Sequence, residues 1–280
     1  MQLIDRILFF ISKRIIDKNK VFAGIHKGET CYLIGNGASI KYFNLEKFNN
    51  HLAIGCNALF LHSDFQKINA KYYFTGHPFL YYPFWKNSYL QRFEKNNLGS
   101  IYKDKLKENK NIILFSSLSN YFAMNKKNKY FFHHFNQKFD GFDKSDLHGS
   151  FSSVVDALSG MLGLAIYMGF EKINLVGCDY AFYPKSNGHF FDFGKFPDLY
   201  DEKPSNEILY KSAQSFADIQ VVVPSDKYKG HILPSVSYEE LTGDKPKYKE
   251  NYEIITSDNL MRLSEVNFPY MIYEEKNRSH

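Results

Sequence analysis

The chain has 280 residues, of which 44% are hydrophobic, and this content excludes an intrinsically disordered protein. Its formal net charge of +5 suits an anionic substrate or an anionic membrane surface and is too small for a dedicated nucleic-acid binder. Three scattered cysteines argue against a disulfide framework and favour a cytoplasmic location, and no apolar run reaches the roughly 18 residues that a membrane span needs.

Residues 1–20 are predicted to form one amphipathic helix, because apolar residues recur there at helical spacing. Its opposite face and its end are basic. Two roles remain open for this segment, namely peripheral contact with the inner membrane or packing on the domain or on a second subunit. The apolar stripe holds Ile4, Ile7, Leu8, Ile11 and Ile15, and the basic residues are Arg6, Lys13, Arg14, Lys18 and Lys20.

From about residue 30 short apolar runs alternate with helical stretches, which is typical of an α/β fold with a Rossmann-like, mostly parallel sheet flanked by helices. We predict this domain over residues 25–245, after the helix within residues 1–24 and before a C-terminal segment, 246–280. The predicted strands are Cys31–Ile34, Leu52–Gly55, Tyr72–Thr75, Asn111–Phe115, Ile173–Val176 and Gln220–Val223.

The first strand ends in the sequence Gly-Asn-Gly-Ala-Ser, which holds Gly35, Asn36, Gly37 and Ser39. Glycines there let backbone N–H groups approach an anion, and Asn36 offers an amide that can donate to a phosphate oxygen. The dinucleotide-binding fingerprint fails because Ile40 stands at its third glycine, and the Walker pattern is absent. The alternative interpretation is a tight turn with no ligand.

The second and third strands also end in polar residues, Asn57 and His77. Either could be an ordinary turn residue. Because the carboxyl ends of parallel strands meet at one edge of a sheet, their recurrence predicts a shared site with Asn36, where His77 would contact the donor or acceptor sugar.

Residues 80–150 are rich in aromatic residues with poor periodicity, and we predict an insertion or lid over the active-site side of the sheet. A helix is predicted over Ser153–Met168, with Ser152 or Ser153 as its N-cap and Gly169 after its end. A second helix is predicted near 206–217.

The strand at 173–176 is followed by Gly177 and Asp179, with Tyr180 and Tyr183 nearby. The carboxylate could hold a ribose hydroxyl, orient a neighbour or bind a cation, or it could simply cap a helix or loop. The tyrosines could stabilise a departing phosphate by hydrogen bonding, or they could be packing residues in a chain that has 21 tyrosines.

His189 lies in a glycine-bounded loop beyond that strand, and its imidazole suits removal of a proton from an acceptor hydroxyl. A surface histidine is the alternative. No Asp-x-Asp motif occurs, so the usual carboxylate clamp for a nucleotide-bound metal is missing from the sequence. We therefore predict metal-independent chemistry, with no metal site and no cofactor. The patterns Gly-x-Ser-x-Gly and His-Glu-x-x-His are absent too.

Several of these stretches occur in the order and approximate spacing of a known group of proteins. The stretches YLIGNGAS, IGCN, YMGFEKINLVGCDYAF and HF, together with the serine-rich entry to the 153–168 helix, resemble bacterial sialyltransferases of the Campylobacter type, glycosyltransferase family 42. They also resemble the broader set called MptE-like or DUF115, as does QVVVPSDKYKGHILPSVSYEEL. The resemblance covers about residues 29–241 and implies a Rossmann-like variant of the GT-A fold.

The resemblance implies that Gly35, Asn36, Gly37 and Asn57 bind the phosphate of a CMP donor. It implies that Ser152 and Ser153 touch nucleotide or phosphate and that His189 is the general base. The family's phosphate-binding tyrosine has no direct match because Ala181 stands at its position, which leaves Tyr180 or Tyr183 to substitute. The family's Asn-Pro is His77-Pro78 here.

We therefore predict a cytoplasmic glycosyltransferase, peripheral at the inner membrane, that transfers a sialic-acid-like nonulosonic acid from CMP to a surface-glycan or lipid-linked acceptor. Two alternatives are an ATP- and magnesium-dependent pterin diphosphokinase of the MptE-like type and a non-catalytic nucleotide-binding protein of a glycan-assembly cluster. A homo-oligomer is compatible with the sequence, and the anomeric outcome is open.

Overall fold

The structure is a computed structural model that describes residues 3–82, 98–125, 127–134, 139, 141–195, 198–200 and 206–265. Its centre is a sheet of eight strands whose pairings are all parallel. In spatial order the strands are β12 (Ser235–Ser237), β10 (Asp218–Val223), β6 (Lys172–Val176), β1 (Thr30–Ile34), β2 (Leu52–Cys56), β3 (Ala70–Thr75), β4 (Ile113–Ser117) and β5 (Lys129–Phe132).

The first strand of the chain, β1, lies in the middle of the sheet, and later strands are added on both sides of it. From β1 the chain adds β2, β3, β4 and β5 on one side, and it then returns to place β6, β10 and β12 on the other side. This is a doubly wound sheet, and its topological switch point lies between β1 and β6. Because ligands of such sheets bind outside the carboxyl ends of the strands at the switch point, the fold itself indicates where a site is to be sought.

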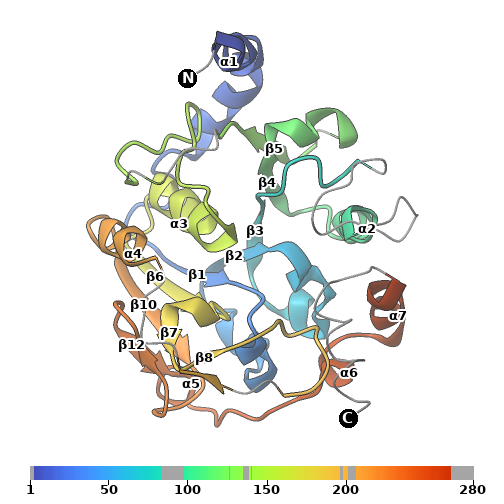
Figure 1. Ribbon diagram of the computed structural model, residues 1–280, viewed down its shortest axis with the longest axis vertical. Helices are drawn as coiled ribbons and strands as arrows, with labels where there is room; N and C mark the ends of the chain where they lie inside the picture. Colours follow the sequence, from blue (N-terminus) through green and yellow to red (C-terminus); the bar gives the residue numbers. More distant parts are fainter. Residues whose placement is uncertain are drawn as a thin grey trace.

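Helices cover both faces of the sheet (Figure 1). A separate apolar core lies under each face. One core joins α3 and α4 to residues such as Leu33 and Phe74, and the other joins α2 and the C-terminal helices to residues such as Ile34 and Tyr73. The alternation of neighbouring strand residues between the two cores follows from the period-two geometry of strands. The helices are α1 (Leu3–Ile16), α2 (Leu98–Glu108), α3 (Ala157–Met168), α4 (Glu207–Gln214), α5 (Tyr238–Thr242), α6 (Asn251–Ile254) and α7 (Ser257–Glu265).

Short 3₁₀ helices and two small antiparallel ribbons complete the described structure. The ribbons are β11 with β7 and β8 with β9. The 3₁₀ helices are η1 (Asp17–Phe22), η2 (Ala38–Tyr42), η3 (Leu45–Phe48), η4 (Asn57–Leu61), η5 (Ser63–Lys67), η6 (Leu118–Ala123) and η7 (Asp179–Ala181), and the ribbon strands are β7 (Phe182–Tyr183), β8 (Lys185–Ser186), β9 (Asp198–Leu199) and β11 (Lys229–Gly230).

The predicted Rossmann-like, mostly parallel sheet is confirmed, and all six predicted strands are present within two residues of their expected bounds. The strands β5 and β12 were not predicted. The expectation of an insertion over residues 80–150 is wrong for residues 98–132, because β4 and β5 extend the main sheet and α2 packs on its face. Residues 83–97 of that segment lie outside the described residues.

The helix predicted over 153–168 is confirmed, but it begins later than expected. Its N-cap is Asp156, whose side chain accepts a hydrogen bond from the Ser159 N–H, while the Ser159 hydroxyl accepts one from the Asp156 N–H in a capping box. Gly169 follows the helix with a φ of 85°, as predicted for a left-handed residue that closes a helix. The helix predicted near 206–217 is α4.

The N-terminal helix is present as α1 followed by η1, and it packs at the edge of the sheet next to β5. Ile16 and Phe22 are buried against the domain, whereas Phe10 and Ile11 are 79% and 70% exposed. At the other end of the chain, residues 246–265 contribute Ile254 and Leu263 to the core. No helix in the described part of the chain is long and apolar enough to cross a bilayer.

Candidate active site

A cleft opens at the carboxyl ends of β1, β2 and β6, on the switch point of the sheet. Its volume is about 170 Å³, which is smaller than the roughly 300–1,000 Å³ that enclose a whole drug-sized ligand. It can therefore hold one part of a nucleotide, with the rest at its mouth. The predicted residues that line it are Gly35, Asn36, Gly37, Asn57, Gly177, Asp179, Tyr180 and His189.

The glycine loop after β1 packs tightly against the turn after β6. The N–H of Gly35 donates to the carbonyl of Val176, and the N–H of Gly37 donates to that of Gly177, each at 2.8 Å. A Cβ atom at Gly37 would lie only 2.2 Å from Oδ1 of Asp179. Glycine is thus required at residue 37 because the Asp179 carboxylate occupies the space of a side chain.

Asp179 also fills the anion position that the sequence suggested for a phosphate. Its carboxylate accepts the N–H of Ser39 at 2.9 Å and the Ser39 hydroxyl, and it is 3% exposed. The backbone N–H of Ala38 donates to it as well. The expectation that the loop N–H groups cradle a phosphate is therefore wrong for Gly35, Gly37 and Ser39, because those groups already bind Val176, Gly177 and Asp179.

Burial raises the pKa of the Asp179 carboxyl from 3.8 to about 6, although the hydrogen bonds from Ser39 and the nearby His189 oppose this shift. Because this pKa is higher in the folded chain than in the unfolded chain, the free energy of unfolding decreases as the pH rises. The unfolded chain ionises this group from about pH 4, whereas the folded chain must ionise it in a desolvated position near pH 6. Between these values the free energy of unfolding should fall by about 3 kcal/mol, at 1.36 kcal/mol per pKa unit.

An Asp179→Asn variant is accordingly expected to gain in stability relative to the wild type as the pH rises from 4 to 7. The measurement is the difference between the two thermal midpoints over that range. Asp226→Asn, at an exposed position, controls for the loss of one negative charge. A constant difference between Asp179→Asn and the wild type over the whole range would contradict the assigned burial effect.

The two rim asparagines lie in the same cleft, and each carries a buried side-chain oxygen without a hydrogen-bond partner. The Asn36 amide nitrogen is 3.1 Å from both the carbonyl oxygen and the sulfur of Cys56, so its hydrogens face Cys56. Its expected role as a donor to phosphate is therefore wrong in this arrangement. Oδ1 of Asn36 and Oδ1 of Asn57 are acceptors, and they suit ligand hydroxyl or amino groups.

His189 is held over the cleft by contacts on both sides of its loop. Gly37 and His189 form a β-bridge, and the Phe190 N–H donates to the Asn36 carbonyl at 3.0 Å. The imidazole stacks on the ring of Phe191, with the centroids 4.8 Å apart. These contacts place His189 beside the glycine loop.

Two residues that the sequence analysis did not assign hold this loop in place. Asp192, 2% exposed, accepts the His189 N–H at 2.7 Å, and its Oδ2 lies 3.5 Å from His189 Nδ1. Lys41, 1% exposed, donates from Nζ to the carbonyls of Asp192 and Gly194 at 2.5 and 2.8 Å. The spacing His-x-x-Asp was a visible signal for Asp192, whereas nothing in the sequence marks Lys41 as buried.

Five predicted site residues do not line the cleft, and one of them is Ser39, whose N–H and hydroxyl bind Asp179. Ser153 is buried and bonds to Ser145, because α3 begins at Ala157, after its N-cap Asp156, and leaves the serines in the preceding turn. Ser152 lies beside it. Tyr183 belongs to the small β7–β11 ribbon and contacts Tyr200, and His77 lies beyond β3 with its carbonyl bonded to Asn120. These expectations are corrected because polar residues near strand ends can face the turn rather than the rim.

Besides the predicted Tyr180, the cleft has groups on and beside it that were not predicted. Asp156 and the first residues of α3 line the cleft, so the positive end of that helix dipole points at it. Tyr180 is 60% exposed at the cleft, and Nζ of Lys185 lies 5.8 Å from the centroid of its ring. Ser186 and Asn206 complete the lining. In the part of the chain that the structure describes, no three His, Cys, Asp or Glu side chains gather as metal ligands.

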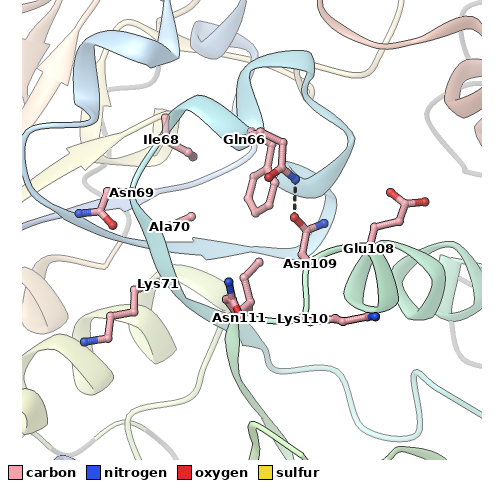
Figure 2. Close-up of a pocket in the computed structure, with 11 residues that line it drawn as sticks. Gln66, Ile68, Asn69, Ala70, Lys71, Glu108, Asn109, Lys110 and Asn111 are labelled. Carbon is pink, nitrogen blue, oxygen red and sulfur yellow. Dashed lines mark hydrogen bonds between the residues drawn. The ribbon is translucent and has the colours of Figure 1, made fainter.

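A second pocket, of about 340 Å³, lies at the opposite end of the sheet, before β3 and β4 (Figure 2). Its polar side chains are mainly amides, and the side chains of Gln66 and Asn109 are hydrogen-bonded to each other across it. Since it lies at the amino ends of the strands, away from the switch point, the cleft that contains His189 is the candidate active site.

No family model and no curated protein sequence matches the chain. Similar solved structures include the MAf glycosyltransferase from Magnetospirillum magneticum AMB-1, with 9% identity and a TM-score of 0.43 over 91% of this chain and 42% of that chain. They also include the sialyltransferase CstII from Campylobacter jejuni in complex with the substrate analogue CMP-3FNeuAc, with 14% identity and a TM-score of 0.40 over 85% of this chain and 99% of that chain. The chain spans less than half the length of the Magnetospirillum protein, and the second structure is a sialyltransferase of the kind that the sequence motifs resemble.

Proposed function

We propose that the chain is a glycosyltransferase that moves a sialic-acid-like nonulosonic acid from a CMP donor to a hydroxyl of a surface-glycan acceptor. The observation that carries this proposal is the convergence of Asn36, Asn57, Asp179 and His189 on one cleft at the switch point. Sugar transfer to a hydroxyl requires a proton acceptor beside the bound donor, and His189 would supply it next to the polar groups that hold part of the nucleotide.

The polar groups of the cleft support an orientation for the nucleotide. The two unpartnered oxygens of Asn36 and Asn57 would accept from ribose hydroxyls or from the amino group of cytosine. The phosphate would lie toward the start of α3 and toward Lys185 and Tyr180, where the helix dipole, an ammonium and a phenol favour negative charge. This placement replaces the glycine loop as the proposed phosphate contact.

In the proposed reaction the acceptor oxygen forms a bond to the anomeric carbon of the donor sugar, and the bond from that carbon to the phosphate oxygen breaks. The bonding electrons leave with CMP, and the acceptor proton passes to His189. The buried carboxylates of Asp179 and Asp192 would stabilise the resulting imidazolium. The proposal of metal independence rests on the missing Asp-x-Asp motif of the sequence.

We further propose that the protein works at the inner membrane, where a lipid-linked or surface-glycan acceptor would be found. The exposed surface of α1 and η1 combines Phe10, Ile11 and the basic Arg14 of α1 with Lys18 of η1. Such a face suits the boundary between acyl chains and anionic headgroups.

A nucleotide screen tests the proposal directly. CMP is expected to raise the thermal midpoint more than UMP, GMP or ATP with magnesium, because only a ligand that prefers the folded state stabilises it. Hydrolysis of a CMP-activated nonulosonic acid by the same preparation should follow. A shift produced only by ATP with magnesium would instead favour a diphosphokinase, and nucleotide binding without any donor hydrolysis would favour a non-catalytic protein.

An Asn57→Gly variant is expected to weaken CMP binding by about 5- to 100-fold, which corresponds to roughly 1–3 kcal/mol for one lost hydrogen bond in a desolvated site. Glycine is the suitable replacement because Asn57 has a φ of 47°, which alanine would adopt only with strain. Titration calorimetry measures the loss.

Asn128→Gly is the matched control for this variant. Asn128 also has a positive φ, 54°, but it lies outside the cleft and bonds to the carbonyl of Lys110. The control should keep the wild-type affinity for CMP. Equal affinities of the wild type and Asn57→Gly would remove Asn57 from the nucleotide site.

A further inference from the structure

A groove of about 690 Å³ lies at the surface of the domain between α2, the end of η6 and the start of β5. Its floor is apolar and includes Leu106 and Met124, which are 5% and 9% exposed. Its walls carry five lysines and no acidic side chain, so the groove differs from the active-site cleft in both place and charge. The lysines are Lys103, Lys107, Lys110, Lys127 and Lys129.

Most of this positive charge is uncompensated. Lys107 pairs with Asp104 at 3.0 Å, but the other four lysines form no ion pair within the described part of the chain. Burial and the neighbouring Lys107 lower the pKa of Lys103, and burial lowers that of Lys129. No acidic side chain lines the groove to offset this, and an anionic ligand would relieve the desolvation of these ammonium groups and the repulsion between Lys103 and Lys107.

Exposed apolar side chains surround the same edge of the sheet. Phe122 is 84% exposed on η6, whose last residue Ala123 lines the groove. Lys129 begins β5, and α1 with its exposed Phe10 and Ile11 packs next to that strand (Figure 1). A soluble polyanion would need the lysines alone, whereas a membrane surface uses cations together with projecting aromatic and aliphatic side chains.

We propose that the lysine groove is a second membrane contact, which binds the phosphate groups of anionic lipids while Phe122 and α1 enter the interface beside it. The edge of the sheet at β5 would thus face the bilayer. This inference extends the membrane contact proposed for α1 and does not depend on the identity of the nucleotide.

The test compares variants in co-sedimentation with vesicles of neutral phosphatidylcholine and with vesicles that also contain anionic phosphatidylglycerol. The groove variant carries Lys110→Gln, Lys127→Gln and Lys129→Gln. The matched control carries Lys229→Gln, Lys245→Gln and Lys247→Gln, which removes the same charge from exposed positions outside the groove. A third variant, Phe10→Ser with Ile11→Ser, reports on the α1 contact separately.

The groove variant is expected to lose about 10- to 100-fold in partition onto anionic vesicles, because each lysine near such a surface contributes roughly a factor of five. The control variant should lose much less, and the wild-type binding should weaken as salt is added. The groove variant should keep its CMP-induced thermal shift, which separates a failure of this inference from a failure of the nucleotide site.

Two results would overturn the inference. One is an equal loss for the groove and control variants, which would leave only a general effect of net charge. The other is binding of inorganic polyphosphate through the groove lysines with no binding to anionic vesicles, which would assign the groove to a soluble polyanion. If the triple variant fails to fold by circular dichroism, the Lys110→Gln, Lys127→Gln double variant, at two exposed positions, gives the same comparison with a smaller expected loss.

Discussion

Replacing His189 by glutamine is expected to lower the rate of sugar transfer by about 10²- to 10⁴-fold, the usual contribution of a positioned general base. Glutamine keeps a hydrogen-bonding side chain in the cleft but cannot take the acceptor proton. The substitution should therefore decrease kcat, whereas the thermal shift that CMP produces should be retained. Transfer assays with a CMP-activated nonulosonic acid, at saturating and limiting donor, separate the two effects.

His51→Gln is the matched control, because His51 precedes β2 at the opposite end of the sheet from the cleft. It should transfer at the wild-type rate. Full transfer activity in His189→Gln would discard His189 as the base, even if CMP binding had already been established. Loss of both CMP binding and transfer would instead show that His189 supports the nucleotide site and would leave its role as a base without support.

Replacing Lys41 by methionine is expected to have the largest effect on stability, a loss of about 2–4 kcal/mol in the free energy of unfolding. Methionine keeps much of the side-chain volume but leaves the carbonyls of Asp192 and Gly194 without this donor in a buried place. Because both carbonyls follow His189 within five residues, the loop that presents the imidazole should loosen, and kcat should fall as well. Chemical denaturation and the transfer assay measure the two effects.

Lys47→Met provides the comparison. Lys47 is 40% exposed and pairs with Asp244 at 3.0 Å on the surface, where solvent screening leaves such an ion pair little effect on stability. If Lys41→Met were as stable as Lys47→Met, the buried ammonium would not be an anchor of the loop. If it were destabilised but fully active below its thermal midpoint, the anchor would be structural only.

Six of the eight strands of the main sheet could be predicted from the sequence alone, because strands and helices follow from local patterns of apolar residues. Apolar runs ended by Gly, Asn and Asp located six strands and their carboxyl ends, and Gly169 located the end of α3. The strand β5 was missed because its residues, KYFF, lie in a stretch so rich in aromatic residues that no alternation stands out. The same composition led to the wrong expectation of an insertion over residues 98–132.

What the sequence could not decide was the use of each polar group at the rim. The hydrogen-bond partner of Ser39 is Asp179, 140 residues further along the chain, and this contact exists only because the sheet order brings β6 beside β1. Because of that contact, the protein's own carboxylate occupies the anion position of the glycine loop. In the same way, the contact of the Asn36 amide nitrogen with Cys56 leaves the amide oxygen available to the cleft. The local periodicity of the sequence determined where the polar residues gather. Pairing between distant segments determined which of their hydrogen-bond donors and acceptors remain available to a ligand. The reason is that a hydrogen bond depends on neighbours in space and not on neighbours in the chain.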